Sequence, residues 1–95
     1  MRRVLIGDVM AAARAILSAP PGARTALADR LLAEAHSAHC YFKRYGRAHP
    51  QWGDGSLMAR ALHHGAPPRG PDRAFLAALA LVLDRLCRRF AQSAA

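Results

Sequence analysis

The sequence predicts an all-α protein, a compact bundle of about four helices in one domain spanning residues 1–95. Apolar residues make up 53% of the 95-residue chain, which is enough to form one core. They recur at the three- and four-residue spacing of helices, without the alternation typical of strands. Segments rich in proline and glycine separate four such stretches. We therefore expect helices over approximately residues 8–18, 23–45, 56–64 and 73–92, and the two long helices, 23–45 and 73–92, form the predicted core.

The first two predicted helices have recognisable ends. Asp8 suits the cap or first turn of the first helix, and the Pro20–Pro21–Gly22 segment ends it. In the second helix, basic residues in the last turn complement the helix dipole, and Gly46 suits the left-handed position that follows. One face of this helix carries an apolar stripe at helical spacing: Leu27, Leu31, Ala35, Ala38, Phe42 and Tyr45.

The third predicted helix is short, with Asp54 or Ser56 as its cap. Its expected inner side carries four apolar residues: Leu57, Met58, Ala61 and Leu62. The connection that follows reads GAPPRGPD and cannot continue the helix, because proline lacks the backbone donor that a helix requires.

Asp72 is the predicted cap of the fourth helix. Its large apolar residues alternate at spacings of three and four, which is the pattern of a helix in a bundle or coiled coil. The series consists of Leu76, Leu79, Leu83, Leu86 and Phe90, widened by Phe75, Val82 and Cys87. This series suits either the core of a monomer or half of a dimer interface, so the sequence leaves monomer and homodimer open.

The chain is strongly basic, with 14 lysine and arginine residues against 6 acidic residues and a net charge of +8. Such an excess attracts nucleic acid or an acidic partner. The excess can also result from the arginine-rich composition of the whole chain, without any polyanion partner. The alternative function is therefore a basic nucleic-acid-binding protein, in which phosphate contacts would come from Arg44, Arg47, Arg60, Arg85, Arg88 and Arg89.

A second alternative is a small metal-binding protein. His36, His39 and Cys40 recur at helical spacing, and such side chains can converge on a soft metal ion. Lys43 lies on the same flank and would repel a cation, and no established zinc motif accompanies the group. Histidines on a helix flank are commonly solvated surface residues, so we expect no cofactor.

We find no catalytic motif in the sequence and expect a protein that is not an enzyme. The acidic residues are scattered, and the glycines do not match the phosphate-binding spacings. Two isolated cysteines within helices are typical of reduced thiols. No apolar stretch reaches the length of a membrane span, so we expect a cytoplasmic protein that does not contact a membrane.

The segment after the second helix, GRAHPQWGDG, is the most distinctive loop of the sequence. Aromatic and cationic residues gather in and before it, and these types often anchor protein interfaces. We predict a partner-binding surface consisting of Tyr45, Arg47, His49 and Trp52. Arg47 and His49 are expected to face outward. An alternative for Trp52 is that it folds back as a lid on the core.

The stretches MRRVLIGDVMAAARAIL and KRYGRAHPQWGDGSLMARAL resemble an uncharacterised family of short bacterial all-α proteins. The most specific part of the likeness is GRAHPQWGDGSLM, residues 46–58. The resemblance implies a genuine folded domain and no particular activity. Taken together, the sequence favours a non-catalytic partner-binding or regulatory module, with another protein as the expected partner and nucleic acid as the alternative.

Overall fold

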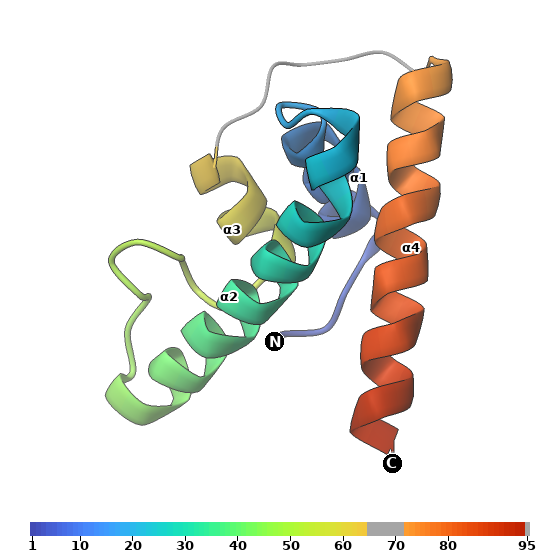
Figure 1. The fold of residues 1–95 in the computed structure, drawn as a ribbon. Coiled ribbons are helices and arrows are strands. Elements are labelled where there is room, and N and C mark those ends of the chain that lie inside the picture. The colour runs from blue at the N-terminus through green and yellow to red at the C-terminus, as the bar shows by residue number, and fades with distance from the viewer. Residues whose placement is uncertain (65–71, 95) are drawn as a thin grey trace.

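The computed structural model describes residues 1–64 and 72–94, and these residues form an all-α fold (Figure 1). The predicted fold class is confirmed, and the observed helix bounds lie close to the expected ones. The predicted connection over residues 65–71 lies outside the described residues. The elements in chain order are α1 (Ile6–Ile16), the short 3-10 helix η1 (Pro21–Ala23), α2 (Arg24–Tyr45), α3 (Leu57–His64) and α4 (Arg73–Ala94).

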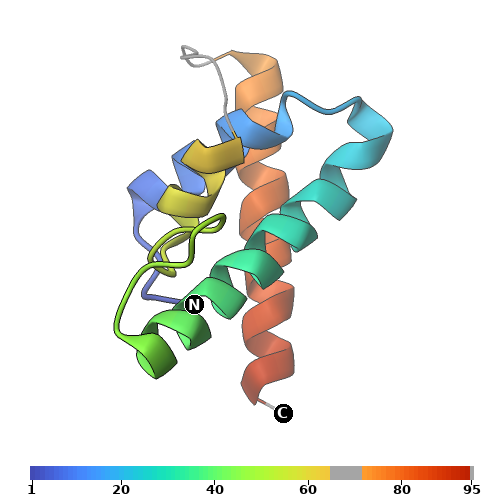
Figure 2. The same ribbon diagram turned by 90° about the vertical axis from the view of Figure 1, so that its left-hand side faces the viewer.

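Helices α1 and α2 form the middle of the molecule. Helix α3 packs on one side of this pair and α4 on the other, and α3 and α4 share no contact within the described residues. Figure 2 shows this layering from the side of α3, with α4 at the back. The segment that joins α2 to α3 therefore lies on the side of the molecule opposite to α4 (Figures 1 and 2).

Helix α1 is buried on nearly every side, and its sequence explains how this is possible. Alanine occupies most of its central positions, and its small side chain lets neighbouring helices approach closely. Larger side chains from the other helices complete the core. The largest fully buried side chains belong to Ile16, Leu31, Leu32, Leu57 and Val82.

Polar caps fix where the helices begin, largely as the sequence predicts. Asp8 lies in the first turn of α1 and accepts a hydrogen bond from the Leu5 backbone N–H at 2.7 Å. Ser56 caps α3, since its hydroxyl accepts the Ala59 N–H at 3.1 Å. Asp72 caps α4 by accepting the Phe75 N–H. Gly46 ends α2 with a left-handed φ of 70°, as expected.

The predicted inner face of α4 is partly wrong. Leu76, Leu83 and Phe90 lie on the surface, with exposed fractions of 57%, 48% and 53%. The helix packs through Phe75, Val82 and Leu86 of the predicted series, together with Ala78, which was not predicted. This rotation brings the small side chain of Ala78 toward the core, which allows closer packing than a row of leucines.

Two smaller predictions about inner faces also need correction. In α3, Leu57 and Ala61 are buried, but Met58 and Leu62 are exposed. Among the helices, α3 packs only on α1 and α2, so its outer side is largely uncovered by the described residues, although the tip of Met58 still lies against Gly7 of α1. In α2, Tyr45 is exposed because it lies in the last turn, beyond the buried part of the stripe, which ends at Ala38.

Candidate functional site

A pair of backbone hydrogen bonds closes a tight turn in the loop between α2 and α3. His49 and Gly53 pair through two backbone hydrogen bonds, from His49 N–H to the Gly53 carbonyl at 2.7 Å and from Gly53 N–H to the His49 carbonyl at 3.1 Å. Inside this turn, His49 Nδ1 accepts hydrogen bonds from the N–H groups of Gln51 and Trp52, each at 3.1 Å. The imidazole therefore organises the turn that the sequence marks as distinctive.

Four rings from this loop and from the last turns of α2 stand in one row, which we call the aromatic ladder: Tyr45, Tyr41, His49 and Trp52. The ring centroids of Tyr45 and Tyr41 lie 4.6 Å apart. Tyr41 meets His49 edge to face at 4.9 Å, and His49 stacks on Trp52 at 4.7 Å with an interplanar angle of 11°. These distances are typical of favourable aromatic pairs.

Two glycines hold the loop against the body of the protein. Gly55 has φ +100°, and a Cβ placed there would lie 2.6 Å from the Cα of His39 on α2. Gly53 has φ +85°, and its Cβ would lie 2.9 Å from the Cβ of Ala59 on α3. Both positions favour glycine because of the positive φ and because of the close approach. The ladder thus stands on a loop with a defined position.

The predicted partner-binding residues come together in this region, but not all of them face outward. Tyr45 is 55% exposed, and Arg47 is exposed as predicted. His49 does not simply face outward, because its ring lies between Tyr41 and Trp52 and its Nδ1 binds the loop backbone. Trp52 is half-buried against His49 and lies outside the apolar core, so it is not a lid on that core.

The arginines predicted to contact a polyanion do not form one patch. Arg60 is buried, and its guanidinium binds Glu34 of α2 through Nε at 2.7 Å and Nη2 at 2.6 Å. Arg85 makes a two-point contact with Asp29, and this hydrogen-bonded carboxylate raises the pKa of Arg85. Arg88 pairs with Asp84 one turn away at 3.0 Å. These three residues therefore serve structural contacts.

Among the cations that pair with no carboxylate in the described residues, two groups lie on different surfaces. Near the ladder, Arg44 and Arg47 make no ion pair within the described residues, and the Arg44 guanidinium lies over the Tyr45 ring at 5.6 Å. On the opposite side of α2, Arg89 lines two neighbouring hollows, one with Arg85 and Arg88 and the other with Arg3 and His36. The unpaired cations of the described residues therefore do not gather on a single surface.

The predicted metal ligands lie close in pairs without forming a complete site. His36 Nε2 is 3.7 Å from the Cys40 sulfur, and His36 Nδ1 contacts the Met1 amine. Burial and neighbouring positive charges, among them the Met1 amine and Lys43, lower the pKa of both His36 and His39. Among the described residues no three candidate ligands come together, so the arrangement does not support a metal site.

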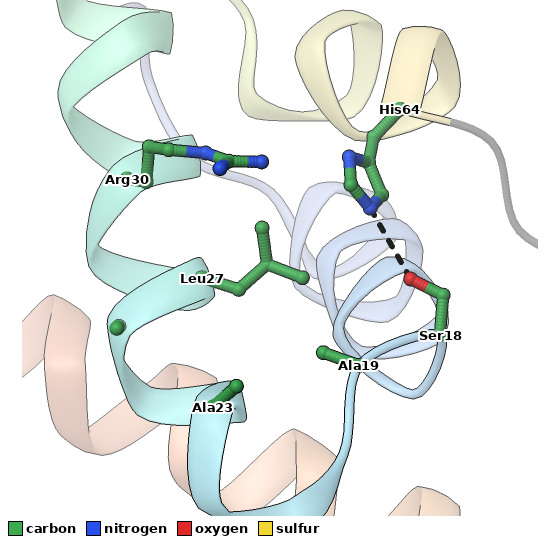
Figure 3. A pocket seen from close by; sticks show the side chains of 7 residues that line it. Ser18, Ala19, Ala23, Leu27, Arg30 and His64 are labelled. Atoms are coloured by element: carbon green, nitrogen blue, oxygen red, sulfur yellow. Dashed lines mark hydrogen bonds between the residues drawn. The ribbon is translucent and has the colours of Figure 1, made fainter.

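A hollow of about 510 Å³ that sequence reasoning missed lies between the end of α1, the start of α2 and the end of α3 (Figure 3). Its polar groups are Ser18, Arg30 and His64. The Ser18 hydroxyl donates to the Ala15 carbonyl at 2.7 Å, so His64 Nε2 donates to Ser18 at 3.2 Å. In this arrangement the serine proton is directed to a backbone carbonyl and not to the histidine. No local signal joins residues 18 and 64.

The fold and the loop define a small helical domain with an aromatic surface loop. The chain belongs to the family described as a domain of unknown function (DUF7742), which it matches over residues 2–86. No curated protein and no solved structure matches the chain. Within the described residues, each helix is too short or too polar to cross a membrane.

Proposed function

We propose that this protein is a non-catalytic module that binds an acidic segment of another protein through the aromatic ladder. The observation that carries the proposal is the row of four contacting rings, which ends in the exposed Tyr45 and stands beside two arginines, Arg44 and Arg47, that have no carboxylate partner in the described residues. Aromatic residues and arginine are the types that most often dominate the binding energy of protein interfaces.

Each part of this surface has a distinct role in the proposal. Tyr45 supplies exposed apolar area and a hydroxyl, at a small cost in side-chain entropy. Arg44 and Arg47 attract carboxylates and orient the partner during the encounter. His49 and Trp52 position the surface, because the histidine ring binds the turn backbone and the tryptophan stacks on that ring.

A protein partner is favoured over nucleic acid by the distribution of the arginines. A protein that neutralises several phosphates needs several arginines or lysines along one surface. Here Arg60 is buried, and Arg85 and Arg88 bind carboxylates of the same chain. Beside the ladder, Arg44 instead lies over the Tyr45 ring, an arrangement that suits an acidic peptide with apolar side chains.

The test is a selection of binding peptides followed by a measured affinity. The immobilised protein is panned against a random peptide phage library, and we expect enrichment of peptides that are rich in Asp and Glu. Binding of a selected peptide is followed by fluorescence of Trp52, the single tryptophan. The double variant Tyr45→Ala, Arg47→Ala should weaken binding at least about 10-fold, since each interface anchor typically contributes more than 1 kcal/mol.

The matched control removes one exposed apolar residue and one exposed arginine elsewhere, Leu62→Ala with Arg88→Ala, and should leave the affinity unchanged. Equal weakening by both double variants, or the absence of any enriched peptide, contradicts the proposal. A mixed-sequence DNA duplex is the second probe. Binding of the duplex that falls steeply with salt and survives the Tyr45 and Arg47 changes would favour the nucleic-acid alternative instead.

A further inference from the structure

Helix α4 presents an apolar surface that the described residues of the chain leave uncovered. Leu76, Leu83 and Phe90 are about half exposed, and each lies seven positions after the one before. Exposed Ala80 and Cys87 lie between them, so the complete row has spacings of 4, 3, 4 and 3. This row, which we call the outer row of α4, repeats at the coiled-coil period and differs from the face that packs on α1 and α2.

From this row we infer that the protein forms a homodimer in which two α4 helices pack against each other in antiparallel orientation. Large and small side chains alternate along the outer row, in the order Leu76, Ala80, Leu83, Cys87 and Phe90. Two such rows fit when a large side chain of one copy meets a small side chain of the other.

The antiparallel pairing satisfies this condition when the two-fold axis crosses the outer row at the height of α4 that lies midway between positions 81 and 82. Leu83 of one copy then faces Ala80 of the second copy, and Leu76 faces Cys87. The ends of the row also match, because Arg73, three positions before Leu76, meets the Phe90 ring of the second copy, which is a favourable cation–π arrangement. Each contact occurs twice, as a two-fold interface requires.

A parallel pairing of the same row fits less well. It would place Leu83 beside Leu83 and Ala80 beside Ala80, so that layers are alternately crowded and loose. It would also bring the two Arg73 side chains together and align the helix dipoles. At the flank of the row, Asp84 already pairs with Arg88 of its own helix at 3.0 Å, so dimerisation does not bury an unpaired carboxylate there.

Sedimentation equilibrium tests the association directly. We expect the protein to change from monomer to dimer over a range of about 1–500 μM. Leu83→Asp should weaken the dimer at least about 30-fold, while circular dichroism and thermal melting of the monomer stay close to those of the parent. Ala80→Glu serves as a second variant at an exposed small position. Leu62→Asp, on the exposed side of α3, is the control and should not change the association.

Disulfide cross-linking tests the orientation. In a Cys40→Ser background, the antiparallel arrangement separates the two Cys87 residues by about 16 Å along the helix axis, so mild oxidation yields no covalent dimer. Adding Leu76→Cys places a thiol opposite Cys87 of the second copy, and a covalent dimer should form. Cross-linking without the Leu76 change indicates a parallel pair, and a protein that stays monomeric throughout the range overturns the inference.

Discussion

Asp8 joins the starts of two helices through one buried carboxylate. Its Oδ2 accepts the Leu5 N–H at the start of α1, and its Oδ1 accepts the Met58 N–H in the first turn of α3 at 2.8 Å. Backbone donors at a helix start have no partner within the helix, and a carboxylate there also interacts favourably with the helix dipole. The attachment of α3 to α1 thus depends on a residue that the sequence marks only as a local cap.

Asp8→Ala should lower the free energy of unfolding by about 3 kcal/mol, because two partly buried N–H groups lose their acceptor. Asp8→Asn keeps an acceptor oxygen and should cost less. Urea unfolding followed by circular dichroism measures both effects. Asp84→Ala removes an exposed carboxylate from α4 and should change stability by less than about 0.5 kcal/mol. A loss from Asp8→Ala no larger than this control would show that the two caps contribute little.

At the scale of elements, α3 divides into a buried side and an exposed side. Leu57→Ala should destabilise the protein by about 2–5 kcal/mol, because its side chain is 1% exposed and its removal leaves a cavity. Leu62→Ala should change the free energy of unfolding by less than about 0.5 kcal/mol, because that side chain is 64% exposed. Equal losses for the two leucines in urea unfolding would contradict this orientation of α3.

The sequence predicts the helices well because their signals are local. Gly46 after the basic turn of α2 and Asp72 before α4 act within a few residues, and both take the predicted roles. The orientation of α4 was not predictable in this way, because leucine spacing alone cannot distinguish a core face from an interface. The ion pair between Arg60 and Glu34 joins residues 26 positions apart, and only the packing of α3 on α2 brings them together.

The candidate loop shows the same division between local and long-range information. Its unusual composition is visible in GRAHPQWGDG, and the gathering of Tyr45, Arg47, His49 and Trp52 follows from their nearness in sequence. The role of His49 Nδ1 in the turn depends on a backbone geometry that composition does not encode. The close approach of Gly55 to His39 likewise depends on how the loop returns across α2.

At the scale of the whole molecule, the net charge of +8 includes several positive groups that lie where the N-terminal segment meets α2 and α4. Burial is the main cause of the lowered pKa of His36, and the Met1 amine, Arg89, His39 and Lys43 add to it. His39 is affected in the same direction by burial, the same amine, Lys43 and Arg2. The folded protein therefore disfavours the protonated form of both histidines, whereas the unfolded chain binds these protons near the ordinary pKa of 6.5.

The sign of the resulting pH dependence follows from this difference. The stability contributed by neutral His36 and His39 is fully present above pH 6.5 and is lost as the pH falls through their lowered folded-state values. The urea midpoint should therefore decrease between pH 7.5 and pH 5, and the double variant His36→Gln, His39→Gln should decrease less over the same interval. Arg89→Gln removes a positive neighbour of His36 and should reduce the decrease partially. If the urea midpoints of the parent and the double variant fall equally in acid, the titration of His36 and His39 does not contribute to the loss of stability.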